Sequence, residues 1–519
     1  MTLRCKLLSI LLILLLILGT TACAEPEGKG GEFTYSLSAD IRSIDPQIAE
    51  GNDTKMVVKA LFEGLCRLDA EGKAVAGVAE SWEAAGTQYT FYLNDKAKWS
   101  NGDKVTAHDF VFGLKRALDP QTGAVGVDEL FIIENARDIY YGLKEVDTLA
   151  VRALDDHTLV INLTQSSTDF PVLTAGAKFM PCNEKFFKET GGRYGLTQSR
   201  ILTNGPFEFD GSYAWESGSY MKLKINEDYA GSLKIKPQTL LVNLSADNKN
   251  YVAVAEGELD MCEIAAADVE KAKAAGCEVI SYTDSVTGIL LNPAAVKLGN
   301  ESVRELFAKS INKAEFLSRL PDGAVPASDI VPSGLKVGAI DYRSVAESGL
   351  STPRDYAISD MIPAVLEKAA MSRVPSVTVL CPDDEISTAI ANGLISSWGV
   401  ELGSYCNIDP LDESSYNSKL YNRDYEIALC TVSSEDGTAY SMLEKFSSKA
   451  SPRLLDSHAY DAILHRESSI VNFMDAEKFL NNQFIFYPIF WQDSYYAVNP
   501  SGSGIIVNHG CPDFISAEK

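Results

Sequence analysis

Segments with strand periodicity and segments with helix periodicity alternate along nearly the whole chain, and this alternation limits the fold more than any other feature. Residues 89–93 (YTFYL) place aromatic or apolar side chains at every second position, which is typical of a strand. Further on, Thr106 can cap a helix whose apolar stripe contains Phe110, Leu114 and Leu118. The sequence therefore predicts a fold of the α/β class, with α+β as the alternative.

The same two patterns predict elements along the rest of the chain. Strands are expected at 33–36, 153–163 (a hairpin), 220–226, 239–244, 258–263, 278–282, 374–381, 425–432 and 484–491. Helices are expected at 52–65, 248–257, 269–275, 302–317, 362–371, 385–398, 442–446, 460–465 and 471–480. Pro488 lies inside the last strand, and because proline cannot donate to a ladder, we expect an edge or a bulge there.

The length and the charge of the chain restrict its architecture and its partners. At 519 residues the chain is too long for one hydrophobic core, so we expect two or three domains. Its net charge is −25, with 71 acidic against 46 basic side chains. Phosphate binding requires a basic surface, so the composition argues against nucleic acid as a partner. The acidity itself is explained by solubility.

The N-terminus has the organisation of a secretory signal peptide. Arg4 and Lys6 precede an apolar run over residues 7–18, which is shorter than the ~20 residues that span a bilayer. Residues 1–22 are therefore expected to be removed on export. Residues 23–31 are polar and rich in Pro and Gly, which predicts a tether that does not pack.

Cys23 follows three small residues, and this arrangement resembles a bacterial lipobox. The resemblance implies that Cys23 is the lipidated first residue of the mature protein. Thr20 stands where the lipobox usually has an aliphatic residue, so ordinary cleavage after Ala22 or Ala24 is the alternative.

Eight further cysteines are scattered through the mature chain, and their spacing does not indicate a metal site. They are Cys66, Cys182, Cys262, Cys277, Cys381, Cys406, Cys430 and Cys511. No C-x-x-C occurs, so the spacing typical of zinc ligands is absent. Isolated cysteines behave as small buried apolar residues, and we expect mostly free thiols. A disulfide between the near pair Cys262 and Cys277 is the alternative.

Sequence motifs of common catalytic sites are missing. The chain contains no G-x-S-x-G, no H-E-x-x-H and no P-loop, and its five histidines are far apart. We therefore predict a protein that is not an enzyme and that uses neither a metal nor a cofactor.

Several spaced motifs between residues 61 and 120 carry a family resemblance. They are LFEGL (61–65), AESW (79–82), YTFYL (89–93) and KWSNGDKVTAHDFVFGLKRALDP (98–120). In this order they resemble the N-terminal signature of the extracellular solute-binding proteins of peptide/nickel-type ABC importers. Oligopeptide- and dipeptide-binding proteins belong to this family. RSIDP (42–46), TNG (203–205) and EGELDM (256–261) agree with the same family.

The resemblance implies a two-lobed periplasmic-binding-protein-like fold with a hinge and an extra inserted subdomain. Carried over to this chain, lobe I comprises residues 32–56, 168–285 and 486–519. The inserted subdomain comprises residues 57–167, and lobe II comprises residues 286–485. Proteins of this architecture close two lobes over a ligand by a hinge motion.

The resemblance places the main ligand-binding position near Glu435. The family has an Asp there that binds the α-ammonium of a peptide, because a buried charge needs a buried counter-charge. Glu is longer by one methylene, so Asp436 is the alternative. Val432, next to Ser433, stands where an aromatic residue is usual, and Leu429 stands where some members have a basic one. The plain alternative is that Glu435 and Asp436 form a solvated acidic turn.

Three further positions match cleft residues of the family. Glu50, Gly51 and Asn52 match a loop whose backbone bonds the peptide, and the alternative is a plain loop before a helix. Trp491, together with Phe490, matches an aromatic pair beside the cleft, and the alternative is core packing. Trp82, Trp99 and Phe110, in contrast, are expected to pack a core.

The family resemblance implies a substrate-binding lipoprotein that captures oligopeptides between two lobes and hands them to the transmembrane permease subunits of an ABC transporter. We expect a monomer at the cell surface or in the periplasm, held to the membrane by lipidated Cys23. Another small solute, such as a nickel chelate, a glycoside or a signalling peptide, is the alternative within this class. A secreted hydrolase or a surface adhesin is the alternative from another class.

Overall fold

The computed structural model describes residues 31–37, 41–124, 126–244, 250–311, 320, 323–337, 340–347, 357–434, 437–448, 450, 452–466, 469–508 and 510–519. The predicted signal peptide and Cys23 lie outside these residues. Helices and strands alternate as expected, and the predicted α/β class is confirmed. No described helix combines the length and the apolar character needed to cross a membrane.

One twelve-stranded sheet runs through the molecule. Its strand order is β18-β17-β19-β13-β20-β12-β1-β11-β10-β8, with β14 paired to β20 and β9 paired to β10. Its strands are β1 (Glu32–Ser36), β8 (Phe207–Phe209), β9 (Trp215–Glu216), β10 (Tyr220–Ile225), β11 (Thr239–Asn243), β12 (Met261–Ile264), β13 (Glu278–Leu291), β14 (Ala324–Pro326), β17 (Thr378–Pro382), β18 (Asn407–Leu411), β19 (Ile427–Ser433) and β20 (Phe486–Val498).

A four-stranded antiparallel sheet and three two-stranded ribbons complete the strands that the structure describes. The four-stranded sheet has the order β4-β5-β7-β6 and consists of β4 (Ala79–Ala85), β5 (Gln88–Leu93), β6 (Val151–Asp155) and β7 (Thr158–Asn162). The ribbons are β2 (Cys66–Leu68) with β3 (Ala74–Ala76), β15 (Lys336–Val337) with β16 (Ile340–Asp341), and β21 (Ile506–Asn508) with β22 (Cys511–Asp513).

Helices surround these sheets. They are α2 (Gly51–Leu61), α3 (Ala107–Leu118), α4 (Ala136–Tyr140), α5 (Phe170–Leu173), α6 (Glu184–Glu189), α7 (Tyr251–Ala255), α8 (Val269–Ala274), α9 (Glu301–Lys309), α11 (Ile358–Lys368), α12 (Glu385–Leu402), α13 (Glu413–Asn422), α14 (Ala439–Glu444), α15 (His458–Leu464) and α16 (Ile470–Asn482).

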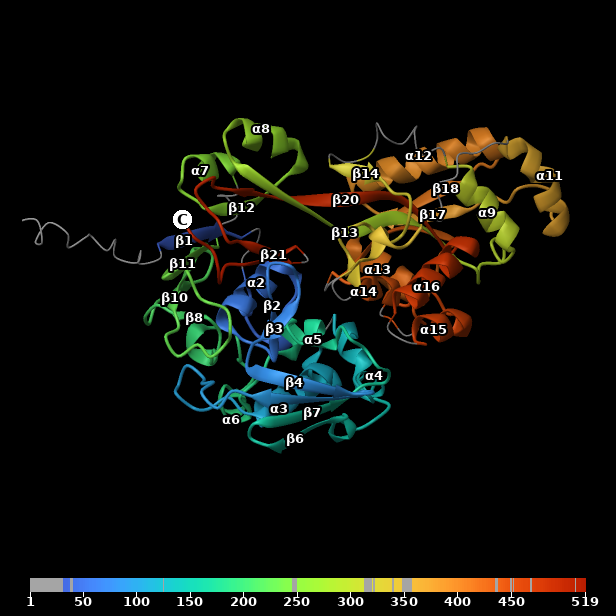
Figure 1. Cartoon of the computed structure of the whole chain (residues 1–519). Helices are drawn as coiled ribbons and strands as arrows, with labels where there is room; N and C mark the ends of the chain where they lie inside the picture. The colour runs from blue at the N-terminus through green and yellow to red at the C-terminus, as the bar shows by residue number, and fades with distance from the viewer. Residues whose placement is uncertain are drawn as a thin grey trace, which may run out of the picture.

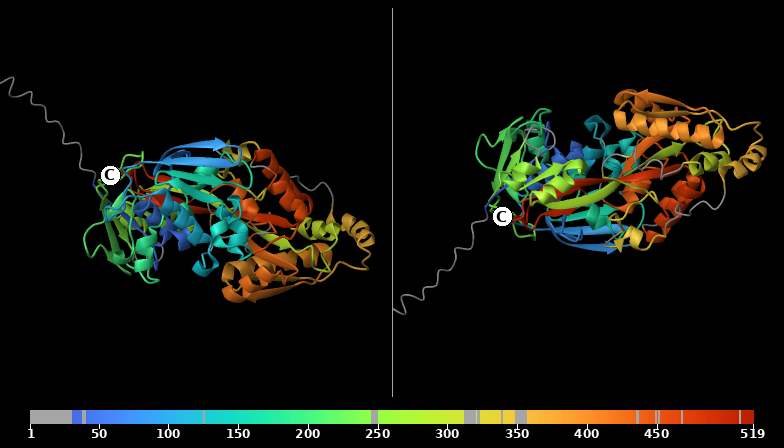
Figure 2. Two further views of the ribbon diagram at one scale, coloured as in Figure 1. Left: turned by 90° about the horizontal axis from the view of Figure 1, so that it is seen from below. Right: turned by 90° about the horizontal axis from the view of Figure 1, so that it is seen from above.

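The strands β13 and β20 connect the two halves of the molecule. They pair antiparallel from Glu278–Val498 to Leu290–Phe486, and Figure 1 shows them as long ribbons between the left-hand and right-hand halves. One end of this pair carries β12, and the other end carries β19. Figure 2 shows from above and below that the helices α9 and α11 lie at the right-hand end of the molecule.

The pairing of β13 with β20 is interrupted at two places, and a proline accounts for the second. The register shifts once between Thr283 and Ser285, and again between Thr287 and Gly288, where Pro488 is the partner of Gly288. A proline inside a central strand removes one ladder hydrogen bond, so the strand bulges around it. The bulge expected at Pro488 is therefore confirmed.

The sequence underestimated β13 and missed β18 and α13. β13 was expected to end at residue 282, but it continues to Leu291 through Asp284 and Gly288. Residues of these types are rare in strands, and pairing on both sides overrides that preference here. The segment 407–411 contains Asp409 and Pro410, which is compatible with β18 being an edge strand. The helix expected at 52–65 ends at Leu61.

The residues that carry the family signature build a core. Asp109 accepts hydrogen bonds from the backbone N–H and the hydroxyl of Thr106, at 2.8 and 3.1 Å, which caps α3. Trp99 and Phe110 are buried in the largest hydrophobic cluster, and Trp82 packs against that cluster while partly exposed. The expected scaffold role of this stretch is confirmed.

The eight cysteines that the structure describes are free thiols, and seven of them are buried. Cys262 and Cys277 lie in one small apolar cluster without forming a disulfide. Burial raises the pKa of the Cys430 thiol to about 12, so this thiol stays protonated and unreactive at neutral pH.

A buried network of charges ties the C-terminal tail to the helix α2 and the strand β2. Arg67 bonds both carboxylate oxygens of Asp513, at 3.0 and 2.9 Å, and also Glu63 Oε2 at 2.8 Å. The Tyr229 hydroxyl donates to the same Glu63 oxygen at 2.6 Å. All three charged side chains are at most 7% exposed. The network therefore joins segments more than 440 residues apart in the chain.

We predict that Arg67→Gln lowers the free energy of unfolding by about 3–5 kcal/mol, because it leaves two buried carboxylates without their counter-charge. Urea denaturation followed by circular dichroism measures the loss. The matched control is Lys98→Gln, which breaks the exposed Lys98–Asp228 pair and should cost at most about 1 kcal/mol. Equal losses in the two variants would contradict the central role of the network.

Candidate functional site

A cavity of about 850 Å³ opens at the carboxyl ends of three parallel strands in the right-hand half of the molecule. β17 pairs in parallel with both β18 and β19, and the chain passes from β17 through α12 to β18 and then back through α13 to β19. The cavity therefore lies where the strand order reverses, which is the usual position of a ligand crevice in such sheets. We call it the strand-end chamber.

The floor of the strand-end chamber is one face of β13, β19 and β20. Ser285, Thr287, Thr431, Phe490 and Gln492 line it. Thr287 and Thr431 are cross-strand partners, and their hydroxyls are 2.7 Å apart. Hydroxyl and amide groups of this kind can donate and accept hydrogen bonds, and Phe490 adds an apolar surface. The floor can therefore hold polar and apolar parts of a ligand.

The rim of the strand-end chamber is acidic. Asp383 and Asp384 follow β17, while Asp412 and Glu413 follow β18. Asp384 caps α12 through Ser387 N, and Asp412 caps α13 through Ser415 N, at 2.8 and 3.1 Å. Hydrogen bonding at that cap keeps the pKa of Asp412 below its usual range, so it is ionised at neutral pH.

Among the described residues that line the strand-end chamber, no side chain is a Lys or an Arg. Leu429, at the position where some family members have a basic residue, is buried at one side of the chamber. The chamber therefore presents negative charge without a fixed cation, and its electrostatics favour a neutral or cationic ligand group.

The structure separates the predicted site residues of β19 and β20 by face. Ser433 lies on the face of Thr431, two residues further along β19, and pairs with Ser285. Val432 and Trp491 belong to the opposite face, where Val432 is 3% exposed and Trp491 packs against the same apolar cluster. The Trp491 indole donates to Asp329 O at 3.1 Å. These two side chains therefore support the wall that carries the chamber.

Glu435 and Asp436 lie outside the described residues, but the residues around them are held. Ser434 N donates to Asp284 O at 2.8 Å, and Lys336 N donates to Gly437 O at 2.9 Å. The predicted acidic pair therefore follows directly after a segment that is fixed to the first register shift of β13.

The loop at residues 50–52, which was predicted to face the acidic pair across the cleft, lies beside the first register shift of β13. Glu50 and Gly51 are exposed at the start of α2, with Glu50 in the N-cap position. Asn52 Nδ2 donates to the hydroxyl of Tyr282 at 3.4 Å, next to the first register shift of β13. Residues near 50, 284 and 434 are thus brought together although they are far apart in sequence.

Asp284 is a site residue that the sequence did not indicate. It lies at the first register shift of β13, between Asn52 and Ser434. Burial raises the pKa of its carboxyl to about 6, while the Lys55 ammonium lowers it less. A carboxylate that is poorly compensated in this way favours an incoming cation. The only sequence signal was a lone Asp after a predicted strand.

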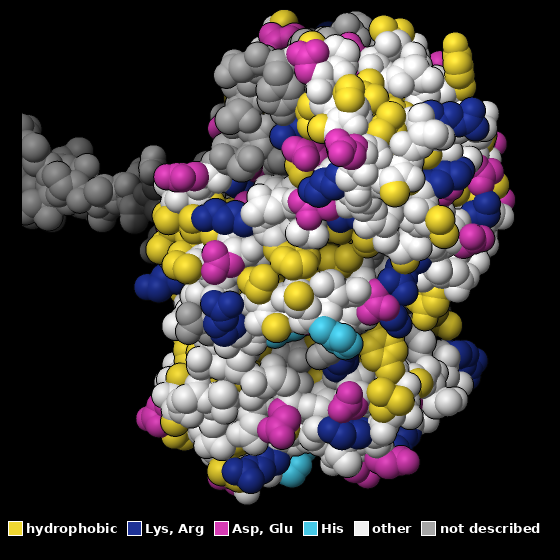
Figure 3. Space-filling model, turned by 90° about the vertical axis from the view of Figure 1, so that its right-hand side faces the viewer, with side chains coloured by type: hydrophobic (Ala, Val, Ile, Leu, Met, Phe, Trp, Pro, Cys, Tyr) yellow, Lys and Arg dark blue, Asp and Glu magenta, His cyan; other side chains and the backbone are white. Residues whose placement is uncertain are grey.

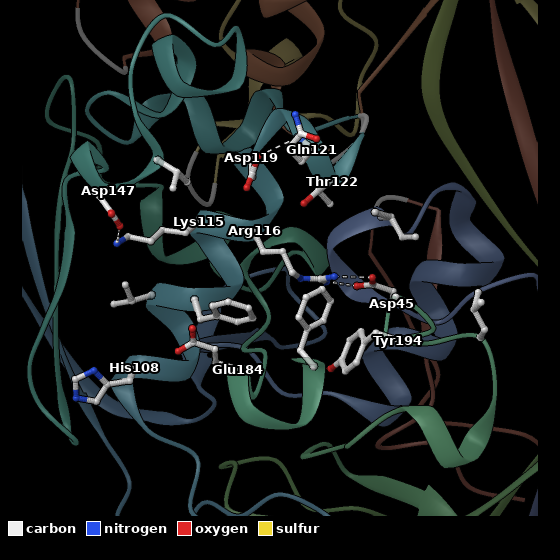
Figure 4. A pocket seen from close by; sticks show the side chains of 17 residues that line it. Asp45, His108, Lys115, Arg116, Asp119, Gln121, Thr122, Asp147, Glu184 and Tyr194 are labelled. Carbon is white, nitrogen blue, oxygen red and sulfur yellow. Dashed lines mark hydrogen bonds and ion pairs between the residues drawn. The ribbon is translucent and has the colours of Figure 1, made fainter. Parts of the chain in front are cut away.

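A second large cavity, of about 730 Å³, lies on the outer side of α3 and is drawn in Figure 4. Its charged groups are already paired across its walls. Arg116 Nη1 bonds Asp45 at 2.8 Å, and Lys115 bonds Asp147 at 2.7 Å. The Arg116 guanidinium also lies 4.6 Å from the ring centre of Phe187. These pairs explain how α3 is held, and they leave the strand-end chamber as the better candidate.

Across the described ranges, no group of three or more His, Cys, Asp or Glu side chains is arranged to hold a metal ion. The arrangement of the site is that of a binding surface: hydroxyls, an apolar ring and carboxylates face a cavity between strand ends.

Comparison with known proteins agrees with this description. The profile of the bacterial extracellular solute-binding proteins, family 5, matches residues 73–452. The oligopeptide-binding protein OppA of Bacillus subtilis (strain 168) is 27% identical over 468 residues, which cover 86% of this chain and 84% of that protein. The dipeptide-binding protein of Lactococcus lactis subsp. cremoris (strain MG1363) is 26% identical, with 88% of this chain and 91% of that protein covered.

The fold is also similar to solved structures. The substrate-binding domain of an oligopeptide ABC transporter from Bacillus anthracis str. Ames superposes with a TM-score of 0.71 at 27% identity. The superposition covers 94% of this chain and 98% of that one. The expected two-lobed binding-protein fold is thereby confirmed, and the predicted residue boundaries of its lobes stay a prediction.

We predict that Asp284→Asn removes a pH dependence of stability. The pKa of Asp284 is raised to about 6 in the folded state, whereas it is about 4 in the unfolded chain. The protonated carboxyl therefore contributes its full stability below about pH 4, and this contribution is lost as the pH rises through about 6. At pH 7 the variant should be more stable by about 1–3 kcal/mol, and at pH 4 it should equal the parent.

Urea denaturation between pH 4 and pH 8 measures this difference. Asp95→Asn, at an exposed position, is the matched control and should leave the pH profile unchanged. Parallel profiles for Asp284→Asn and the parent would contradict the assignment.

Proposed function

The chain belongs to the bacterial extracellular solute-binding proteins of family 5, and on that premise we propose that it captures oligopeptides between its lobes and delivers them to the transmembrane permease subunits of an ABC importer. The observation that carries the ligand class is the strand-end chamber beside β19. An extended peptide can bond the backbone of a strand while its side chains enter a cavity.

In this proposal the peptide lies across the first register shift of β13. Its α-ammonium meets Glu435 or Asp436, and Asp284 adds a second, poorly compensated carboxylate close by. Ser433 contributes from the face that carries the chamber floor. A cation bound here would compensate the carboxylate of Asp284, whose desolvation the chain itself offsets only in part.

The facing side of the cleft contributes through its backbone. Glu50, Gly51 and Asn52 form the start of α2, where backbone N–H groups have no partner within the helix. Val432 and Trp491 act from behind the wall, since their side chains pack on the opposite face of the sheet. Together these residues give an affinity that depends little on the side chains of the peptide.

We further propose that Cys23 carries the lipid that holds the protein at the outer face of the membrane or in the periplasm. The mature protein acts as a monomer, and its chemistry is binding without catalysis. The support for the lipid is the lipobox-like sequence before Cys23, followed by a polar tether.

We predict that the double charge reversal Glu435→Lys with Asp436→Lys abolishes peptide binding, because it removes the counter-charge of the ammonium. Thermal shift with a peptide library measures binding, since a ligand of the folded state raises its stability by RT ln(1 + [L]/Kd). The matched control is Glu256→Lys with Glu258→Lys, which makes the same change of charge at two exposed positions beside α7. Unchanged affinity in the first variant would refute the proposed site.

We predict a preference for basic side chains in the strand-end chamber. Peptides with Lys in place of Glu at the residue that enters the chamber should bind about three- to tenfold more tightly, because each exposed charge pair contributes up to about 1 kcal/mol. Titration calorimetry with paired peptides measures the ratio.

The variant Asp383→Asn with Glu413→Gln neutralises two of the four rim carboxylates and should lower that preference, while leaving the binding of an all-alanine peptide unchanged. Both residues are exposed, and the residues that cap α12 and α13 are Asp384 and Asp412 instead. An undiminished preference in this variant would place the peptide side chains elsewhere.

A further inference from the structure

A polar pocket of about 390 Å³ lies between α4, the C-terminal end of α13 and the segment that precedes α15, away from the strand-end chamber floor. Three guanidinium groups line it, those of Arg137, Arg423 and Arg453. We call it the arginine pocket. Its composition is unexpected in a chain of net charge −25, where basic side chains are the minority.

Arg137 is the least compensated of the three. It projects from α4 and its Nη2 atom is buried, yet that atom forms no hydrogen bond with any part of the chain that the structure describes. Its guanidinium carbon lies 5.3 Å from the ring centre of Phe131, so the ring supports it from one side. A buried guanidinium N–H without an acceptor costs free energy, and a bound acceptor would recover it.

The carboxylates around the arginine pocket are already engaged by other groups. A single oxygen of Asp456 serves both Arg423 and Arg453, at 3.1 and 3.3 Å. Glu444 lies 2.7 Å from a ring nitrogen of His465. Asp461 accepts from the backbone N–H of Ser448 at 2.9 Å and from its hydroxyl.

Desolvation lowers the pKa of Arg137, and the field of Glu444 offsets this only in part. These acids therefore reduce the positive potential of the pocket without supplying the acceptor that Arg137 lacks.

We propose that the arginine pocket binds a multivalent oxyanion of the phosphate or sulfate class, held by Arg137 from one side and by Arg423 and Arg453 from the other. Planar guanidinium groups match the oxygens of such anions in pairs, which gives both strength and geometry. The hydroxyls of Tyr421 and Ser448 also line the pocket. Its volume leaves room for ordered waters, each of which takes about 30 Å³.

A bound oxyanion would bridge the two halves of the molecule. α4 lies below the crossing strands in Figure 1, whereas α13 and α15 belong to the right-hand half. Figure 3 views this side and shows the surface hollowed between its upper and lower parts, with basic side chains near the hollow. Any ligand that binds only this relative placement of the halves shifts the population toward it. The anion would thus favour this relative placement of the halves, and this consequence rests on the proposed function.

The test is titration calorimetry of the purified chain with sodium phosphate and sodium sulfate, against sodium chloride at equal ionic strength. We expect saturable binding of one anion per chain that chloride does not reproduce. Arg137→Gln and Arg453→Gln should each weaken it at least about tenfold, since each removes a charge-assisted hydrogen bond. Arg152→Gln, at an exposed position on β6, is the matched control and should bind as the parent does.

The Arg453 side chain is about half exposed (48%), so this variant keeps the test valid if Arg137→Gln is unstable. Sedimentation with phosphatidylglycerol vesicles, against phosphatidylcholine vesicles, separates a lipid headgroup from a free anion as the source. If the parent binds either the free anion or the phosphatidylglycerol vesicles, and both variants lose that binding, the result supports the arginine pocket. An equal response to chloride, or unchanged binding in both variants, overturns it.

Peptide affinity is measured separately, with and without the anion. If the variants lose anion binding but bind peptides normally when no anion is added, the result would support the pocket independently of the proposed function. Failure of all peptides to bind, with saturable anion binding intact, would instead count against the proposed function alone.

Discussion

The continuous pairing of β13 with β20 is the constraint on which the rest of the structure depends. Backbone hydrogen bonds run along this pair from one half of the molecule to the other, and every neighbouring strand takes its position from it. Two interruptions occur, one near the middle at Asp284 and one close to the Leu290–Phe486 end at Pro488. Bulged strands bend and twist more than regular ones, so the pair can join two packed bodies and still allow one to turn against the other.

Partly buried charges without a full counter-charge indicate where this molecule can bind a ligand of opposite charge. The Arg67 network is internally satisfied, and its role is to fix the C-terminal tail against α2 and β2. Asp284 and Arg137, in contrast, are at least partly buried without a full counter-charge, and each faces a junction between the halves. A ligand of opposite charge repays the desolvation that folding leaves uncompensated, which is why such residues indicate sites when stability alone does not explain them.

The sequence predicted much of the fold because most elements depend on local patterns. The hairpin at 153–163, the capped helix after Thr106 and the bulge at Pro488 follow from periodicity, capping and the missing N–H of proline. The full length of β13 did not follow, because Asp284 and Gly288 join a strand only through partners that lie 140 or more residues away. Propensity is a weak guide wherever tertiary pairing supplies the hydrogen bonds.

By itself, the sequence determined the α/β class and the solute-binding family, since these reside in local periodicity and ordered motifs. Only the tertiary structure decided which side chains share a surface. It turned the face of β19 that carries Ser433 toward the chamber floor and the face of Val432 toward an apolar cluster, and it brought Asn52 beside Tyr282. It also gathered three arginines of an acidic chain around one pocket. Such proximity depends on strand order and on the packing of the halves, which no local pattern encodes.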